Sequence, residues 1–159
     1  MLTNLLLFAA LSAVTQNAPA TRPLSPLRPT ACTVVSRADV EEALGRPLSG
    51  GKEEIEEGTS NCDYAANGGM VSITIQRLTG KPNLQVEFAA LKKEIPEGVV
   101  RDAPGFPQAF YFDLPGAGTQ LHIIDGSSAH LMISILGFGD APQVSAAAAQ
   151  IARKAIKRL

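Results

Sequence analysis

The chain has 159 residues, of which 45% are hydrophobic and 18% charged, so it can bury the core of one compact domain and is short for two. Its 14 basic and 15 acidic side chains leave a formal net charge of −1, which argues against a nucleic-acid-binding protein held by phosphate neutralisation. Trp is absent and aromatic residues make up only 5%, so platforms for stacking on bases or sugars are scarce.

Residues 1–20 have the pattern of a secretory signal peptide. An uncharged apolar run over 5–14 is shorter than the roughly 20 residues that span a bilayer. Ala18 and Ala20 then match the small-residue pattern read by signal peptidase, and we expect cleavage after Ala20. No Lys or Arg precedes the run, so a buried N-terminal helix is the alternative. The signal-peptide interpretation predicts a periplasmic or secreted protein with no transmembrane segment in the mature chain.

Residues 21–31 are rich in proline and predict a flexible leader, which leaves 32–159 as a single domain. Cys32 follows a small residue, as in lipidated bacterial proteins. Pro29 occupies the position where lipidation requires an apolar residue, so we do not expect a lipid anchor.

The chain has two cysteines, Cys32 and Cys62. Even cysteine usage in an exported chain predicts a disulfide, with two separate buried thiols as the alternative. Closing a loop of about 30 residues would contribute roughly 3–4 kcal/mol in the chain-entropy model. The pair lacks a nearby His or third Cys, so it is not typical of a zinc site.

A first helix is expected over 37–44, because Ser36 can cap it and Gly45 can end it. The acidic run that follows, Glu53–Glu57, is interpreted either as a charged edge strand or as a loop. Calcium binding is not favoured there, because the run lacks the ligand spacing and the turning glycine of calcium loops.

An Asn-Gly pair at 67–68 predicts a tight hairpin, since both turn positions favour positive φ. With this turn, Tyr64 faces Val71 and Cys62 faces Ile73 across the strands. Cys62 and Tyr64 then share the buried face. The disulfide would therefore pin the first helix region onto this sheet.

Further along, the periodicity predicts a helix over 83–95, strands over 108–114, 119–124 and 129–136, and a last helix from Asp140. A four-residue loop at 115–118 would place Phe110 opposite Ile123 and Phe112 opposite Leu121. Strands in hairpin-linked runs, each alternating apolar and polar residues, predict an α+β fold in the order α-β-β-α-β-β-β-α. It would be a twisted antiparallel sheet with helices packed mainly on one face.

Cys32, Ala43-Leu44-Gly45 and Cys62-Asp63-Tyr64 together resemble a group of small exported bacterial domains of unknown function. Many members are secreted proteins or lipoproteins, with a cysteine, a short helix ending in Leu-Gly, and Cys-x-aromatic before a strand. The resemblance covers nearly the whole mature chain and implies an exported, disulfide-linked α+β domain. It implies no activity and brings no catalytic residues. Pro29 departs from the lipoprotein members.

One group of polar side chains could bind a ligand. If the apolar residues of the last strands share the buried face, His122 pairs with His130, Tyr111 lies opposite His122, and Met132 is diagonal to them. Cross-strand histidines can share a transition metal, with Tyr111 or Met132 as a further ligand. The alternative is an amphipathic strand that shows polar residues to water. An even-numbered turn after Asp125 would place the two histidines on opposite faces.

Catalytic motifs are not favoured. Ser127 lies close in sequence to both histidines, but a hairpin tip offers neither a fixed base nor an oxyanion site. Gly50-Gly51-Lys52 lacks the other residues of a phosphate-binding loop. The basic residues at the end of the last helix suit its dipole, with contact to anionic lipid or envelope polymers as the alternative.

These observations predict a non-enzymatic exported domain that binds an envelope protein or a small ligand, with no cofactor and no nucleic-acid partner. The alternative function is metal or small-molecule handling by His122 and His130. An enzyme is the least favoured, because the chain has only two histidines and both cysteines are expected to be paired.

Overall fold

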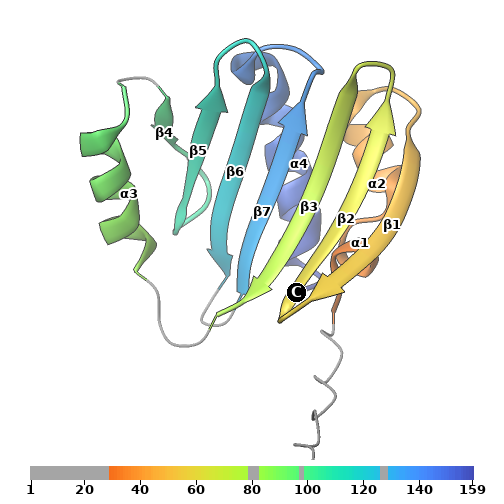
Figure 1. Ribbon diagram of the computed structural model, residues 1–159, viewed down its shortest axis with the longest axis horizontal. Helices are drawn as coiled ribbons and strands as arrows, with labels where there is room; N and C mark the ends of the chain where they lie inside the picture. The colour runs from red at the N-terminus through yellow and green to blue at the C-terminus, as the bar shows by residue number, and fades with distance from the viewer. Residues whose placement is uncertain (1–28, 79–82, 97–98, 126–128) are drawn as a thin grey trace, which may run out of the picture.

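The computed structural model describes residues 29–78, 83–96, 99–125 and 129–159. A seven-stranded sheet forms its centre, with the strand order β1-β2-β3-β7-β6-β5-β4 and antiparallel pairing throughout (Figure 1). In chain order the elements are α1 (Ala31–Val34), α2 (Arg37–Leu44), β1 (Ser49–Glu56), β2 (Thr59–Ala66), β3 (Gly69–Arg77), α3 (Leu84–Glu94), β4 (Val100–Asp102), β5 (Ala109–Leu114), β6 (Gly118–Asp125), β7 (Ala129–Leu136) and α4 (Ala141–Ile156).

The predicted fold, with the order α-β-β-α-β-β-β-α, is wrong. The structure adds the four-residue helix α1, the eight-residue strand β1 and the three-residue strand β4, so the molecule is dominated by its sheet. Strand β1 has no apolar alternation because it is an edge strand that pairs through its backbone and leaves most side chains exposed. Strand β4 is too short to produce a periodic pattern.

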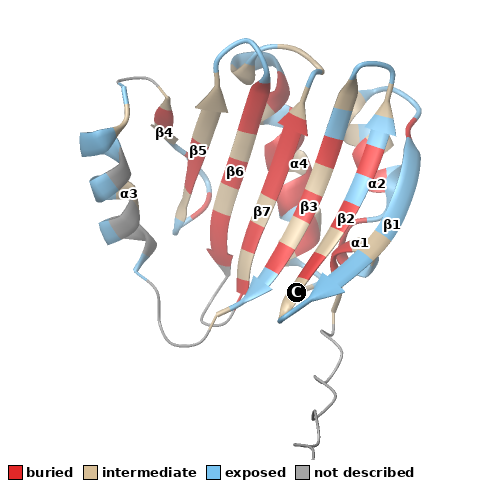
Figure 2. Ribbon diagram, viewed as in Figure 1, coloured by how far each residue is buried: buried red, intermediate tan, exposed pale blue. Residues whose placement is uncertain are grey.

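Helices α1, α2 and α4 cover one face of the sheet, which we call the helix face (Figure 1). Alternate side chains of β2, β3, β6 and β7 point to this face and are fully or nearly fully buried, as the banded strands of Figure 2 show. Helix α4 packs against them with an alanine-rich stripe, in which small side chains allow close approach to the strands. The strand residues of this core are Cys62, Tyr64, Val71, Ile73, Ile75, Leu121, Ile123, Leu131, Ile133 and Ile135.

Helix α3 packs on the opposite face, at the β4 end of the sheet. Phe88 and Ile95 contact a second apolar cluster built on Val100, Phe110 and Ile124. These three strand residues point away from the helix face, because their neighbours along each strand point toward it. The helices therefore lie on both faces, and the expectation that they gather mainly on one face needs this correction.

Turn geometry decides the strand registers. The hairpin between β2 and β3 has the predicted pairs, Tyr64 with Val71 and Cys62 with Ile73. The hairpin between β5 and β6 does not, because Leu114 already pairs with Gly118 and the loop covers only 115–117. Gly118 belongs to the strand, with φ of 140° and a backbone so close to β7 that an added Cβ would lie 2.0 Å from the Ile135 carbonyl oxygen.

The N-terminal predictions fall mainly outside the described residues. The signal peptide, 1–20, lies outside them, and so does most of the leader, 21–31. Of that leader, Ala31 is fully buried as the first residue of α1. In the described ranges, no helix combines the length and the apolar character needed to cross a membrane.

Candidate functional site

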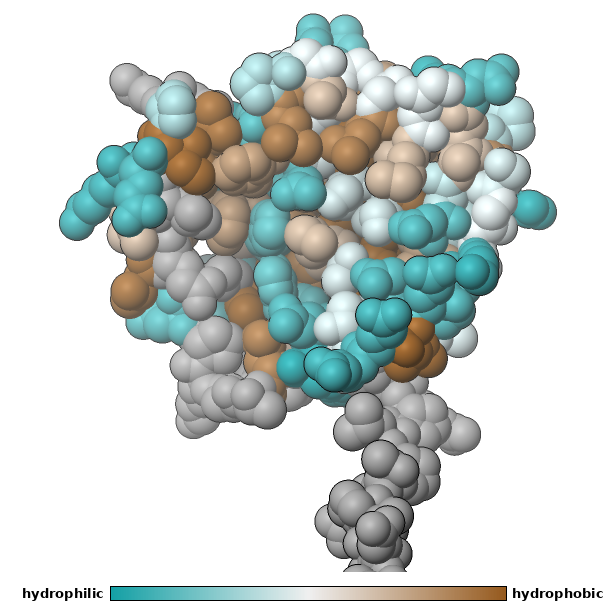
Figure 3. Space-filling model, viewed as in Figure 1, coloured by the Kyte–Doolittle hydropathy of each residue, from teal (hydrophilic) through white to brown (hydrophobic). Residues whose placement is uncertain are grey.

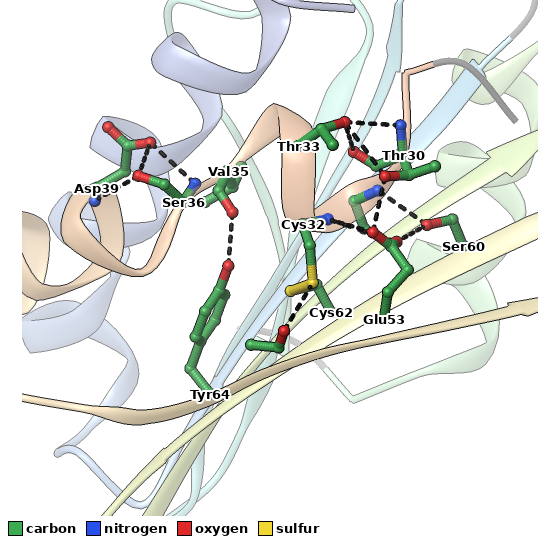
Figure 4. The surroundings of a disulfide bond; sticks show 12 residues. Thr30, Cys32, Thr33, Val35, Ser36, Asp39, Glu53, Ser60, Cys62 and Tyr64 are labelled. Carbon is green, nitrogen blue, oxygen red and sulfur yellow. Dashed lines mark hydrogen bonds between the residues drawn. A yellow bond between two sulfur atoms is a disulfide. The ribbon is translucent and has the colours of Figure 1, made fainter.

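The predicted disulfide is present and fastens α1 to the sheet (Figure 4). Cys32 in α1 is bonded to Cys62 in β2, with 5.1 Å between their Cα atoms. Glu53 of β1 accepts hydrogen bonds from the Thr30 hydroxyl at 2.7 Å, from the Cys32 amide at 3.3 Å and from the Ser60 hydroxyl. The carboxylate thus satisfies the amide and hydroxyl groups at the start of α1, and this region has a structural role.

An ion cluster that sequence reasoning missed joins α2 to the end of α4. Asp39 is 7% exposed and lies 2.6 Å from the Arg158 guanidinium and 3.1 Å from the Lys154 ammonium. The hydrogen bond from Arg158 is the main cause that holds the pKa of Asp39 well below its usual range. Lys154 also contacts Glu42 at 2.7 Å. The basic end of α4 therefore neutralises acids of α2, which gives these charges a structural explanation.

The two histidines lie together on the face opposite α4. His122 Nδ1 and His130 Nε2 are 3.2 Å apart, within hydrogen-bonding distance. The predicted direct pairing is wrong, since His122 faces Met132 and His130 faces Ile124. The register differs from the prediction by two residues, an even number, so both side chains keep the predicted face and become diagonal neighbours.

A row of stacked rings extends from the histidine pair toward α3. Phe110 of β5 stacks on His122 with 4.7 Å between centroids and 5° between planes, and Phe88 of α3 stacks on Phe110 at 5.4 Å. The Lys92 ammonium lies 4.3 Å from the centroid of Phe88. We call Phe88, Phe110, His122 and His130 the ring row. Phe110 was missed as a site residue because the predicted register placed it on the buried face.

His122 is held in its neutral form. Burial desolvates the imidazolium and, with a smaller contribution from facing His130, lowers the pKa of His122 to about 4. One ring nitrogen of a neutral imidazole carries a lone pair that can accept a proton or bind a metal. At neutral pH His122 therefore offers an uncharged nitrogen ligand rather than a positive charge.

The other two predicted ligands, Tyr111 and Met132, lie on different faces of the sheet. Tyr111 pairs with Leu121 and points to the helix face, where it is 5% exposed and its hydroxyl donates to the Ser145 carbonyl at 3.2 Å. Phe110 occupies the position opposite His122 that was predicted for Tyr111. Met132 lies directly across from His122, on the same face and partly exposed. The structure thus brings together His122, His130 and Met132 and excludes Tyr111.

Beyond the ring row the same face is polar, and Figure 3 views it directly. Hydrophobic residues gather toward the α3 side and the upper rim, whereas hydrophilic and neutral residues cover the centre and the β1 side. In the described ranges no helix packs on this face over β2, β3 and β7. We call this whole face, the two histidines of the ring row included, the open face. Its central side chains are Asn61, Asp63, Ser72, Thr74, Gln76, Gln120, His122, His130, Met132 and Ser134.

A shallow pocket of about 280 Å³ lies away from these residues. It contains neither a titratable side chain nor any residue predicted to bind a ligand. We therefore assign it no role. It is lined by Pro47, Leu48, Ser49, Ala65, Ala66 and Asn67.

Within the part of the chain that the structure describes, no group of three or more His, Cys, Asp or Glu side chains is placed to hold a metal ion. A metal site that used His122 and His130 would therefore need a ligand of another type. No protein-family model, curated protein or solved structure matches the chain. The resemblance to small exported bacterial domains accordingly stays a prediction.

Proposed function

We propose that the protein is an exported, non-enzymatic binding domain that holds a polypeptide partner on its open face. The observation that carries this proposal is the contrast between the two faces of one sheet. Helices α1, α2 and α4 bury the helix face, whereas the open face over β2, β3 and β7 presents hydrogen-bonding side chains without a covering helix in the described ranges.

The centre of the open face is suited to docking because it is built from short side chains on a paired sheet. Ser72 and Thr74 lie on β3 and are partly exposed, and Ser72 pairs with the buried Ser134 of β7 beneath them. The backbone beneath them is paired on both sides within the sheet. A partner that docks here immobilises few long side chains, so the entropic cost of association is low.

The chemistry of the face favours a polypeptide with a basic segment. The Asn61 side-chain oxygen accepts from the Thr74 hydroxyl at 2.7 Å, and the amide groups of Asn61 and Gln120 carry the N–H donors and second acceptor lone pairs with which peptide groups can pair. On the β1 side the face carries Glu54, Glu56 and Asp63 and a single counter-charge, Lys52, paired with Glu54 at 2.9 Å. This acidic excess would steer a basic partner to the face and fix its orientation.

Site-specific photo-crosslinking in the producing organism tests the proposal. A photoreactive amino acid at Thr74 should give one adduct of discrete mass whose added component is a polypeptide. The same amino acid at Arg37, exposed on α2, should not give this adduct. Adding Asp63→Lys to the Thr74 probe should weaken the adduct by charge reversal. The absence of an adduct at Thr74, or an equal one at Arg37, would contradict the proposal.

Export is supported by the disulfide, since such bonds persist in oxidising compartments. It is also supported by the predicted signal peptide over 1–20. Mass spectrometry of the protein from the cell envelope or the medium should find a chain that begins at Thr21. A protein that retains Met1 and stays in the cytoplasm would contradict export.

A further inference from the structure

The histidine pair already has the spacing of two ligands of one metal ion. Its two facing nitrogens, His122 Nδ1 and His130 Nε2, are 3.2 Å apart. Imidazole nitrogens bind first-row metals at about 2.0–2.1 Å, so two of them at a tetrahedral angle lie about 3.3 Å apart. An ion beside the line joining these nitrogens would bind both after a small tilt of the rings.

The same two nitrogens can bind an ion without leaving a charge imbalance. When both rings carry one proton each, one nitrogen of this hydrogen bond donates and the other accepts. When an ion takes the donor's place, that ring moves its proton to its other nitrogen. The pair then supplies two lone pairs and stays neutral, with no oxidation or reduction.

Met132 supplies a third ligand of a different kind. It lies directly opposite His122 on β7 and two residues beyond His130, so all three side chains leave the same face of the sheet. Side chains opposite each other in an antiparallel pair have Cβ atoms about 4.5–5.5 Å apart. A flexible methionine thioether at that distance reaches an ion held by the imidazole.

The surroundings select the type of ion. The side chains described at strand positions next to the two imidazoles on this face include Phe110, Thr74 and Gln76, and none of these positions carries a carboxylate. Hard ions such as calcium and magnesium require several oxygen ligands, usually with carboxylates among them. Imidazole instead suits zinc, copper, iron and nickel, and among these the soft thioether favours monovalent copper.

Phe110 holds the site in place. It stacks on His122 with nearly parallel planes, and Phe88 stacks on its other side. The imidazole of His122 therefore has little freedom to turn away from His130. Both histidines remain partly exposed, so an ion from solvent can reach them. Because stacking on Phe110 already orients the His122 ring, less conformational entropy is lost when the ligands assemble around an ion.

We propose that His122, His130 and Met132 form a binding site for one monovalent copper ion. The site lies on the open face, but its ligands come from β6 and β7 alone, so ion binding can be measured without a polypeptide partner. It also differs from the predicted site, which was built on direct pairing of the histidines and included Tyr111.

Competition for Cu(I) tests the site. The full chain, purified with its disulfide intact, is titrated under anaerobic conditions against a chromophoric Cu(I) chelator. We expect one Cu(I) per chain and simultaneous shifts of the imidazole proton resonances of both histidines in NMR spectra. The same titration with Zn²⁺ should show weaker binding. Tighter binding of Zn²⁺ than of Cu(I), or no shift of either histidine at one equivalent of Cu(I), would overturn the proposal.

Variants locate the ion. His130→Gln should weaken Cu(I) binding by more than the roughly 10–100-fold that loss of an outer-shell partner causes. Met132→Leu, which keeps the side-chain volume, should weaken it by a smaller factor. Met70→Leu is the matched control, because Met70 is exposed at the far end of the same face. Unchanged Cu(I) binding in His130→Gln, or a loss in Met70→Leu equal to that in Met132→Leu, would overturn the assignment. If a variant does not fold, the shifts of the two histidines in the wild-type NMR spectra decide.

Discussion

The helix face is secured by a covalent bond and by ion pairs, whereas the part of the open face around His122 is held by aromatic and imidazole rings. On the helix face, Cys32 is bonded to Cys62, and Asp39 lies against Arg158 and Lys154. On the open face, His122 contacts another imidazole and a phenyl ring. The difference teaches that the charged groups of the helix face already have their partners inside the fold. On the β1 side of the open face, by contrast, the carboxylates of Glu56 and Asp63 are exposed to a partner.

The largest expected effect comes from the covalent link of the helix face. The double variant Cys32→Ala/Cys62→Ala should lose about 3–4 kcal/mol of unfolding free energy, since the bond closes a loop with a sequence separation of 30. Urea denaturation measures the loss. Reduced wild-type protein is the control and should lose a similar amount. A loss below about 1 kcal/mol would show that the link adds little to the helix face.

The second largest effect should be a loss of unfolding free energy in acid, caused by His122 on the open face. The pKa of His122 is lowered to about 4 from 6.5, so the unfolded chain takes up a proton that the folded chain refuses. The stability is fully present above about pH 6.5 and falls as the pH drops to about 4, by up to about 3 kcal/mol. Urea midpoints across this window measure it. In His122→Phe the unfolding free energy should depend less on pH in this window. An unchanged pH dependence would refute the assignment to His122.

Removal of the Asp39 charge should cost somewhat less, about 2 kcal/mol for Asp39→Asn, because its cationic partners are partly exposed to water. The pKa of Asp39 is lowered in the fold, so its contribution is present above the unfolded value near 3.9 and is lost as the pH falls below it. The difference between wild type and Asp39→Asn should therefore shrink below about pH 4.

Glu42 provides the control for this prediction, because it contacts Lys154 from a side chain that is 64% exposed. Glu42→Gln should change the unfolding free energy by less than about 0.5 kcal/mol. An equal effect of the two substitutions, measured by urea denaturation, would mean that the burial of Asp39 does not matter.

The smallest stability effect is expected on the polar part of the open face. Asp63 is exposed there, and Asp63→Lys should change the unfolding free energy by no more than about 0.5 kcal/mol. The same substitution should still reduce crosslinking of a basic partner from position 74. Thermal denaturation of the variant separates the two effects. A large loss of stability would show that the face has a structural role of its own.

Local signals explain what the sequence could predict. The Asn-Gly turn at 67–68 determines the β2–β3 register, and the cysteine pair was identified from its number and context. The loop at 115–117 carried no comparable signal, so one residue too many was assigned to it and Phe110 was placed on the wrong face. Residues 126–128, between β6 and β7, lie outside the described ranges, and the predicted register of β6 with β7 was off by two residues.

Other features depend on residues far apart in the chain. Asp39 and Arg158 are separated by 119 positions, and no local pattern links an acid of one helix to the end of another. The stacking of Phe88 on Phe110 likewise requires α3 to cross to the second face of the sheet. Strand β1 was left undecided between strand and loop, because its exposed charges and glycines leave no apolar alternation.

The pairing of β3 with β7 at the centre of the sheet sets an order for folding. The strands of β1–β3 pair within a short stretch of chain, and so do those of β4–β7, whereas the central ladder joins Val71 to Ile135. Distant pairing carries a larger loop-closure entropy and slows folding. Cys32 and Cys62 both lie in the part of the chain that ends with β3. Their disulfide can therefore form once β1, β2 and β3 have paired, before β7 has joined the sheet.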